Sequence, residues 1–512
     1  MRSSIHAERG IVATSQPLAA QAGLSMLRAG GNAVDAALAS AITLTVVEPT
    51  SNGLGSDAFA LVFDGKRLWG LNGSGALPEA SPLPGMKSPW PESGWCPVMV
   101  PGAPRAWADL HERFGRLPFR QLFEPAVGYA RDGFPLSPVV ARFWHKAAGR
   151  FKDPAFSDWQ KTFLPAGFVP RPGAVWRCPE LASTLERIAE SRGEDFYTGS
   201  IAERIDHAAK TAGGALRASD LAAHRSLWVD PLSVPYHGCE ICELPPNSQG
   251  IVALEALGIL STRSPQDPGQ VLHESIEALK CAFAEALGQV GDPRDCPSVT
   301  GLIDPAHLRE QAAGIQGRAR PFVPDAPYLG GTVLLAAADR SGFMVSFIQS
   351  NYMGFGSGVV VPGTGIALSN RALCFSRKDG HPNRVGGGRR SYHTLMPGFL
   401  MRDGQPWGPF GVMGGFMQPQ GHLQLVQWLV DWGDLPQAAV DRPRWRWDGG
   451  VRVAVEPDFP EATLHELVRR GHDVVRAEST DGFGRAQVIL RKAEGGFVAG
   501  SDSRADGQAA GW

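Results

Sequence analysis

The chain lacks most features of secreted, membrane and nucleic-acid-binding proteins. Its seven cysteines are scattered and odd in number, which argues against a disulfide framework and favours reduced thiols. No apolar run reaches the length of a membrane span, and charges occupy the first residues, where a signal peptide would have an apolar stretch. The net charge of -2 gives no electrostatic case for nucleic acid or an anionic membrane. We therefore expect a cytoplasmic protein that acts on a small molecule.

Common catalytic and cofactor motifs are also missing. The 13 histidines include no HExxH pattern and no close metal pair, and neither a GxSxG elbow nor a Walker loop occurs. We therefore expect no cofactor and no resident metal. Cys239 and Cys242 have the spacing of redox and zinc sites, but they fall in an expected strand and no second pair completes a zinc site. The two-residue period of a strand points these thiols to opposite faces, so we interpret the pair as structural.

The size and composition of the chain indicate a large globular enzyme. Its 512 residues exceed the usual limit of one compact core, so two domains or one large layered sandwich are expected. Apolar residues make up 43% and charged residues 20%, as in ordinary globular enzymes.

Helix and strand signals alternate over the first hundred residues. A helix is expected to begin at Pro17, with Gly30 as its C-terminal stop. Asn32 is expected to cap an alanine-rich helix that runs to about Val47. Residues 58–69 contain two apolar runs around Asp-Gly, which predicts a hairpin.

The rest of the chain divides near its middle. Residues 101–313 are expected to be mostly helical cover, and the proline- and glycine-containing stretch 314–331 is expected to be an exposed irregular connector where the chain can be cut. Strands then dominate, with a hairpin expected from 333–338 and 343–348. The first of these strands is apolar on both faces, so layers are expected above and below it.

Thr332 follows Gly330 and Gly331 at the start of that strand. A cut before Thr332 would give one residue both a hydroxyl nucleophile and a free α-amino base, as an N-terminal nucleophile hydrolase requires. The glycines would let the backbone adopt a strained conformation at the scissile bond. A threonine after two glycines is, taken alone, usually only the start of a strand, so the hypothesis depends on more distant loops.

Three glycine-containing segments follow Thr332. Residues 350–358 contain alternating glycines but lead into a strand, which excludes a dinucleotide loop and favours close backbone approach beside a pocket. Gly414 and Gly415 precede an apolar helix expected from about His422, and their amides either bind an oxyanion or simply form a strand-to-helix turn. The arginine pair 389–390 is expected to be solvated surface charge.

Ordered motifs along nearly the whole chain resemble the γ-glutamyltransferase (glutathione hydrolase) family, a branch of the N-terminal nucleophile hydrolases. The segments that carry the resemblance are 10–15, 28–37, 47–49, 100–102, 130–134, 244–250, 441–444 and 501–504. The variant loop 350–356 is similar to that of the bacterial glutathione hydrolase-like proenzymes, and more distantly to cephalosporin and oxamate amidohydrolases. The short segment between 375 and 393 suggests a more open site than in members that carry a lid.

The resemblance implies an α/β fold, a four-layer αββα sandwich of the N-terminal nucleophile hydrolase type with added helical cover. It implies self-cleavage between Gly331 and Thr332, giving a large chain of residues 1–331 and a small chain of residues 332–512. Together these two chains are expected to form one αββα domain and to remain paired. The sequence leaves open whether two such molecules form a homodimer.

The family pattern also implies catalytic roles. Thr332 is the expected nucleophile and its freed α-amine the base, while Ser350 falls where a second hydroxyl assists. Gly414 and Gly415 are expected to supply the oxyanion amides. The acyl-enzyme then passes to water or to an acceptor amine.

The positions that bind a glutamyl group in the family carry different residues here. Ser74 replaces an arginine for the substrate α-carboxylate, and Cys374 replaces an aspartate for the α-amino group. Arg371 takes the neighbouring glutamine position. Truncating one partner of a buried charged pair costs about 2 to 5 kcal/mol, so weak or absent γ-glutamyl affinity is expected.

Three further substrate-binding positions differ as well. His393 and Thr394 replace a serine pair, and Tyr352 replaces an asparagine, with Asn351 one place out of register. The leading hypothesis is an autoprocessing amidohydrolase acting on a non-glutamyl or atypical acyl amide. One alternative is a true γ-glutamyltransferase or glutathione hydrolase, with Arg371 supplying the missing carboxylate contact from the opposite wall. The other is an unprocessed pseudoenzyme that acts as a binding protein.

Overall fold

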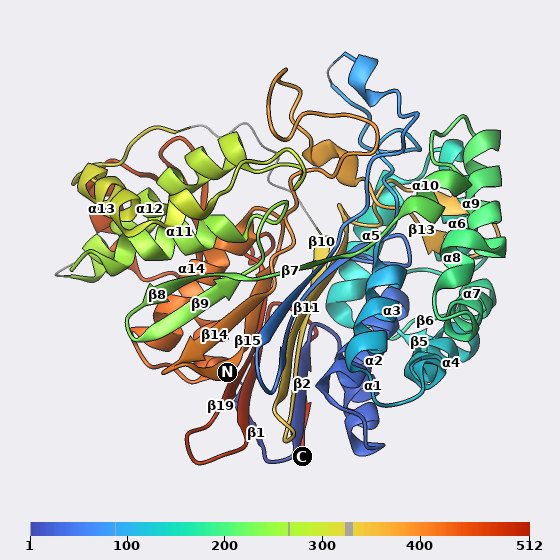
Figure 1. Ribbon diagram of the computed structural model, residues 1–512, viewed down its shortest axis with the longest axis horizontal. Helices are drawn as coiled ribbons and strands as arrows, with labels where there is room; N and C mark the ends of the chain where they lie inside the picture. The colour runs from blue at the N-terminus through green and yellow to red at the C-terminus, as the bar shows by residue number, and fades with distance from the viewer. Residues whose placement is uncertain (1, 88, 265–266, 323–330) are drawn as a thin grey trace.

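Two seven-stranded antiparallel sheets lie face to face, and helices cover the outer side of each one (Figure 1). The computed structural model describes residues 2–87, 89–264, 267–322 and 331–512. The arrangement is the four-layer αββα sandwich with additional helices that the sequence predicts. Within these residues, no helix is both long enough and apolar enough to cross a membrane.

The strands of the first sheet follow the order β21-β2-β10-β11-β3-β4-β7. Their bounds are Gln508–Gly511, Gly10–Thr14, Gly331–Asp339, Phe343–Tyr352, Asp57–Asp64, Leu68–Gly73 and Leu227–Val229. The second sheet has the order β1-β20-β19-β15-β14-β9-β8. Its strands are Ile5–Ala7, Phe497–Ser501, Arg485–Arg491, Gln405–Met413, Gly398–Arg402, Cys239–Glu243 and Leu232–Tyr236.

Two groups of helices form the outer layers (Figure 1). Those beside the first sheet are α1 Pro17–Arg28, α2 Ala33–Val47, α3 Ala103–Phe114, α4 Glu124–Asp132, α5 Pro138–Arg150, α6 Ser157–Phe163, α7 Pro179–Glu190, α8 Glu194–Thr198, α9 Ser200–Thr211 and α10 Ala218–Ala223. Those beside the second sheet are α11 Gly250–Ser261, α12 Pro268–Gln289, α13 Pro305–Gly314, α14 Met417–Val430, α15 Pro436–Asp441 and α16 Glu461–Arg469. A small sheet of β16 Trp445–Gly449, β17 Arg452–Val455 and β18 Asp473–Arg476 adjoins the second group.

Strand β10 is buried on both of its faces, as its sequence predicts. Val333 and Leu335 pack against the helices of the first outer layer. Leu334 and Ala336 point the other way, into the apolar layer between the two sheets. Because successive side chains of a strand alternate, one short segment contributes to two separate cores.

Local signals located several elements correctly. The cap predicted at Asn32 is present, and the structure shows that it is a capping box: the Asn32 side chain accepts from the amide of Asp35, while Asp35 accepts from the amide of Asn32. Every residue of α2 is buried, because other helices wrap around it on the sheet. Cys239 packs on the helical side of the second sheet and Cys242 between the sheets, which confirms their opposite orientation.

Both sheets combine strands from before and after residue 331. Strands β2, β3, β4 and β7 precede it in the first sheet, while β10, β11 and β21 begin at it or follow it. The two ends of the chain also meet, because the amides of Glu8 and Arg9 donate to the carbonyl of Trp512 at 3.1 and 2.8 Å. Of the connector expected over 314–331, residues 323–330 lie outside the described residues.

Replacing Leu334 by alanine should destabilise the fold by about 2 to 5 kcal/mol, because it leaves a cavity between the two sheets. Leu334 is 1% exposed. Urea unfolding followed by circular dichroism measures the change. Val468→Ala is the control, since Val468 is 57% exposed on α16 and its loss should change stability by less than about 0.5 kcal/mol. Equal effects of the two substitutions would contradict this view of the inter-sheet layer.

Candidate active site

An irregularity in strand pairing places Thr332 opposite two residues of the neighbouring strand. Gly331 pairs with Tyr352 and Val333 with Gln349, so Ser350 and the residue after it face Thr332 alone. Such a bulge re-aims side chains and interrupts regular pairing, and bulges are common beside active sites. The irregularity lies at one end of β10 and β11, the two central strands of the first sheet.

A chain of hydroxyl groups leads from Thr332 back to the carbonyl that precedes it. Thr332 Oγ1 lies 3.4 Å from Ser350 Oγ, and Ser350 donates a short hydrogen bond to the carbonyl oxygen of Gly331. Ser350 Oγ also accepts from the amide of Tyr352 at 2.7 Å. Thr332 and Ser350 are both buried. The hydrogen bond from Ser350 polarises the Gly331 carbonyl, and the Thr332 hydroxyl lies in the same buried group.

The expected glycine strain concerns Gly330 and Gly331. A Cβ built at Gly331 would approach nothing closer than 3.4 Å, so close packing does not require glycine at this position. Gly331 is the first residue of β10 and lies next to the bulge. Gly330 lies outside the described residues, so the expected strain stays a prediction.

Gly414 and Gly415 form the turn between β15 and α14. Their φ values of 131° and 61° are unfavourable for other residues, which explains glycine at both positions. Among the described residues, neither amide N–H has a hydrogen-bond acceptor. The following helix starts at Met417, five residues before the predicted His422, and Pro419 is accommodated in its first turn.

Arg371 is a fully buried cation with unused donors. Its Nη1 donates to Thr394 Oγ1 at 2.7 Å and lies 3.9 Å from Cys374 Sγ. Its guanidinium sits over the ring of Tyr352, 4.6 Å from the ring centroid. No described residue accepts a hydrogen bond from Nε or Nη2. A buried cation with two free donors is suited to an incoming anion.

Tyr352 and Cys374 are uncharged neighbours of the Arg371 guanidinium. Tyr352 has φ 76°, a left-handed conformation that a bulky residue rarely adopts and that turns the chain after Ser350. Its hydroxyl lies close enough to Cys374 for each group to affect the ionisation of the other. Burial raises the pKa of both Tyr352 and Cys374, so neither offers the negative charge that an ammonium group would need.

His393 and Asp57 form a buried hydrogen-bonded pair. Their closest atoms, His393 Nε2 and Asp57 Oδ2, are 3.0 Å apart, and the amide of Leu395 donates to Nδ1, so Nε2 carries the proton. Burial and the charge of Arg371 lower the pKa of His393 to about 4. Burial alone would raise the pKa of Asp57, but the bond and charge of His393 and the charge of Arg371 outweigh it and lower that pKa.

Ser74 belongs to a separate polar cluster next to this pair. Its hydroxyl donates to Asn72 Oδ1 at 2.7 Å and lies 3.3 Å from both Oδ1 and Nδ2 of Asn247. Gly75, the next residue, donates its amide to Asp57 at 2.8 Å. The Ser74 hydroxyl is therefore already engaged by protein groups.

The expectation of surface charge at Arg389 and Arg390 is wrong. Arg389 is paired with Asp295, and only 11% of its side chain is exposed. Arg390 donates to the carbonyl of Arg225 at 2.7 Å and reaches Ser74 Oγ at 3.5 Å. The preceding glycine-rich turn folds both arginines back against acceptors that are distant in sequence, which the local pattern does not reveal.

Hydrogen bonds connect the residues around Arg371 with the glycine pair. Gln249 makes this connection, because its Nε2 donates to the carbonyls of both Thr394 and Gly415. No direct hydrogen bond between Thr332 and the glycine pair is present among the described residues. Sequence reasoning missed the roles of Gln249, Asp57 and Arg390. Only Gln249 lay in a recognised motif, 244–250.

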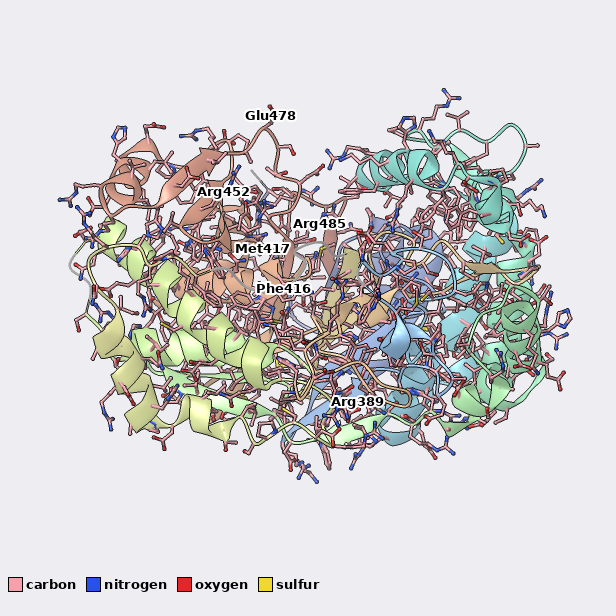
Figure 2. All side chains as sticks on the ribbon, turned by 90° about the horizontal axis from the view of Figure 1, so that it is seen from above. Arg389, Phe416, Met417, Arg452, Glu478 and Arg485 are labelled. Carbon is pink, nitrogen blue, oxygen red and sulfur yellow. The ribbon has the colours of Figure 1, made fainter. Side chains whose placement is uncertain are left out.

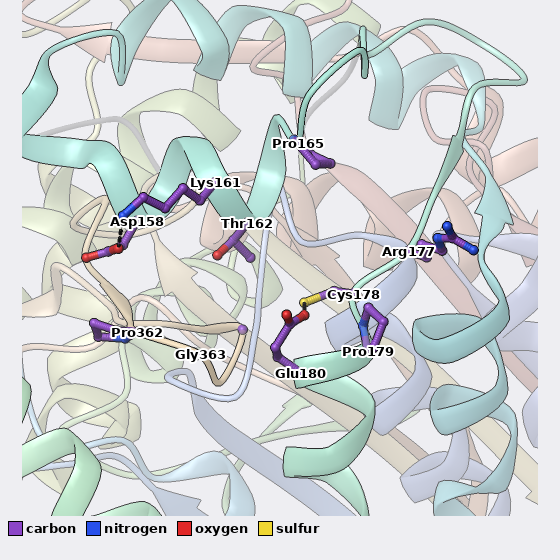
Figure 3. Close-up of a pocket in the computed structure, with 11 residues that line it drawn as sticks. Asp158, Lys161, Thr162, Pro165, Arg177, Cys178, Pro179, Glu180, Pro362 and Gly363 are labelled. Atoms are coloured by element: carbon purple, nitrogen blue, oxygen red, sulfur yellow. Dashed lines mark hydrogen bonds and ion pairs between the residues drawn. The ribbon is translucent and has the colours of Figure 1, made fainter.

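A hollow of about 270 Å³ adjoins the network. Its lining includes Cys374, Tyr392 and Phe416, the last of which follows the glycine pair. Figure 2 shows Phe416 and Met417 near the middle of the molecule, where α14 begins. A larger hollow of about 410 Å³ lies in the helical cover beside Cys178 and contains none of the predicted site residues (Figure 3). The smaller one is the better candidate for a substrate entrance.

Comparisons with known proteins show which family the chain is similar to. A family model described as gamma-glutamyltranspeptidase matches residues 19–512. The chain is 34% identical to the glutathione hydrolase-like YwrD proenzyme of Bacillus subtilis and to the oxamate amidohydrolase proenzyme of Klebsiella pneumoniae, each over 100% of both chains. The crystal structure of cephalosporin acylase from Bacillus halodurans matches with a TM-score of 0.96 and 48% identity, covering 100% of this chain and 97% of that one.

Replacing His393 by glutamine should weaken the dependence of stability on pH. The unfolded chain binds the His393 proton near pH 6.5, but the folded chain binds it only near pH 4. The stability contributed by neutral His393 is therefore complete above about pH 6.5 and is lost as the pH falls towards 4. Between about pH 7 and pH 4.5, wild type should lose about 2 kcal/mol more than the variant in urea unfolding.

The matched control for this experiment is His465→Gln. His465 is 79% exposed on α16, so its substitution should leave the wild-type pH dependence intact. A His393→Gln variant that loses as much stability on acidification as wild type would show that His393 is not held neutral.

Proposed function

The chain belongs to the gamma-glutamyltranspeptidase family, and on that premise we propose that it is a proenzyme that cuts itself before Thr332 and then hydrolyses an amide with Thr332 as nucleophile. The observation that carries this proposal is the hydrogen-bonded sequence from the Thr332 hydroxyl through Ser350 to the Gly331 carbonyl. Nucleophile, assisting hydroxyl and scissile carbonyl are all contained in one buried bulge.

Self-cleavage proceeds as an N-to-O acyl shift. Thr332 Oγ1 attacks the carbonyl carbon of Gly331, and the hydrogen bond from Ser350 stabilises the negative charge that develops on the oxygen. The C–N bond then breaks, and the Thr332 nitrogen leaves as an amine after taking up the hydroxyl proton. Water hydrolyses the resulting ester, which yields a carboxylate at Gly331 and restores the hydroxyl of Thr332, whose amino group is now free. The chains 1–331 and 332–512 remain associated through their shared sheets.

In turnover, the free α-amine of Thr332 takes the proton from its own hydroxyl. The oxygen attacks the substrate carbonyl, the leaving amine departs with a proton, and water then releases the acyl group from the enzyme. The amides of Gly414 and Gly415 are unengaged by protein acceptors, which suits them to the oxyanion formed in both steps.

The acyl group of the substrate carries a carboxylate that pairs with Arg371. The two free donors of this buried guanidinium support a bidentate contact, which an arginine makes with a carboxylate better than a lysine does. Cys374 lies on the same side and supplies no negative charge for an α-amino group. The site therefore favours a carboxylate-bearing acyl group without the ammonium group of glutamate.

True γ-glutamyl transfer is the second candidate. It is favoured by Arg390, whose guanidinium approaches Ser74 at 3.5 Å and brings a positive charge to the position where the family has an arginine. The engagement of Arg390 with the carbonyl of Arg225 and the absence of a carboxylate at Cys374 weigh against it.

Thr332→Ala should abolish self-cleavage, and Ser350→Ala should slow it by about 100-fold or more because one oxyanion donor is lost. On a denaturing gel, wild type should give two bands in place of the 54.7 kDa precursor. The time course of precursor loss after a translation stop gives the rate.

Thr332→Ser is the matched control, since it retains a hydroxyl nucleophile and should still be cut. A single uncut band for wild type would contradict the proposal and favour a pseudoenzyme. Cutting that persists in Thr332→Ala would assign the nucleophile to another residue.

Arg371→Gln should remove a preference for acidic acyl groups. We expect wild type to hydrolyse succinyl and glutaryl anilides with a higher kcat/KM than butanoyl and pentanoyl anilides of equal chain length. In the variant, the ratio of kcat/KM for the acidic anilides to kcat/KM for the neutral ones should fall by roughly 30-fold or more. This fall is equivalent to about 2 kcal/mol or more for a buried charge contact.

Arg371→Lys tests the geometry, because it keeps the charge but not the fork of donors, and it should recover only part of the preference. Denaturing gels establish that both variants are cut. An unchanged ratio in Arg371→Gln would refute the carboxylate assignment, while faster turnover of γ-glutamyl anilide than of glutaryl anilide would favour the second candidate.

A further inference from the structure

Three helices beside the second sheet bring two glutamates and a histidine together. Glu255 lies on α11, Glu285 on α12 and His307 on α13. One ligand atom from each lies within 4.8 Å of the others. This cluster lies in the outer helical layer and has no part in the network around Thr332.

Glu255 is fully buried and has no hydrogen-bond partner. Neither of its carboxylate oxygens accepts a hydrogen bond from a described residue. Nε2 of His307 also makes no hydrogen bond to a described residue. A buried carboxyl group without partners is costly, so it is either protonated or bound to a cation. Burial and the charge of Glu285 raise the pKa of Glu255 to about 9, which makes a bound proton the alternative to a metal.

The distances from His307 to the two glutamates match the ligand spacing of a tetrahedral metal site. His307 Nε2 lies 3.2 Å from Glu285 Oε2 and 3.6 Å from Glu255 Oε1. Two ligands at about 2.0 to 2.2 Å from a tetrahedral zinc ion are roughly 3.4 Å apart. We propose that Glu255, Glu285 and His307 bind one divalent zinc ion, with water as the fourth ligand.

The surroundings of the cluster support this assignment. Gln311, one turn after His307, donates to Glu285 Oε1 at 2.6 Å and leaves Oε2 directed at His307. Metal-bound carboxylates are typically oriented by such outer hydrogen bonds. His307 and Glu285 are 24% and 23% exposed, so solvent reaches one side of the site and can supply both the ion and the water.

Close helix packing holds the ligands in place. A Cβ at Gly258, one turn after Glu255, would lie 2.7 Å from the side chain of Leu308. Glycine therefore allows α13 to approach α11 closely next to the carboxylate, and Leu308 follows His307 directly. The ion would join α11, α12 and α13 at this contact.

A second group of potential ligands, formed by His273, Glu277 and His472, is largely engaged with protein groups. Glu277 pairs with Lys280 at 2.7 Å and also accepts from Arg320. The two histidines are 2.9 Å apart and hydrogen-bonded to each other, and only Nδ1 of His472 lacks a partner among the described residues. Because two cations already neutralise Glu277, this group is the weaker candidate for a metal ion.

The proposed ion has a structural role. Helix α11 begins directly after Gln249, which contacts both Thr394 and Gly415. Among the described residues, α13 is the last helix before Thr332. Zinc would fasten these helices to each other from the outside, without touching the reacting atoms. It should raise thermal stability and leave self-cleavage unchanged.

The test uses the full-length protein without a histidine tag. After dialysis against a chelator, isothermal titration with zinc chloride should show one site per chain in wild type and raise the thermal midpoint. Glu255→Gln and His307→Ala should both lose this site and the thermal shift. Magnesium and calcium, which prefer oxygen ligands, should bind at least tenfold more weakly.

His465→Ala is the matched control, because His465 also lies next to a glutamate on a helix, 3.9 Å from Glu461, and it should retain full zinc binding. The variant Glu255→Gln keeps the shape of a protonated carboxyl group and should fold. Equal zinc binding by wild type and Glu255→Gln would overturn the proposal, as would the absence of zinc binding by wild type, which would leave Glu255 with a proton.

Discussion

The burial of β10 on both faces is the constraint on which the rest of the structure depends. Its odd-numbered side chains belong to the core under the first helical layer, and its even-numbered ones belong to the layer between the sheets. Neither sheet can shift relative to the other without disturbing this strand. Thr332 therefore starts from a rigid support, while the bulge beside Ser350 gives its side chain a direction that regular pairing would not.

Local signals in the sequence were sufficient for the elements whose causes are local. Asn32 caps α2 through atoms only three residues away, and the apolar runs of β10 and β11 show their burial directly. The site depends on contacts between distant residues, such as Asp57 with His393, 336 positions apart. The glycine at 331 did not predict a backbone conformation, because glycine is compatible with left-handed and with extended backbone alike.

Charge explains why the family resemblance and the expected specificity diverge. A zwitterionic ligand needs a cation and an anion at matched positions, but the described network supplies a cation at Arg371 and a neutral thiol at Cys374. Asp57, the nearby anion, is already occupied by His393. In the proposed function, different residues therefore carry out the chemistry at the strand ends and the selection of the acyl group.

The contact between the two ends of the chain gives the molecule the topology of a nearly closed ring. Trp512 accepts hydrogen bonds from Glu8 and Arg9, and β21 lies beside β2 in the first sheet. A short linker across these ends, combined with a new start at residue 332, would produce a circular permutant with the same strand order. In such a permutant, removal of the initiator residue would expose the threonine amine directly, and the proposed maturation would no longer depend on breaking an internal peptide bond.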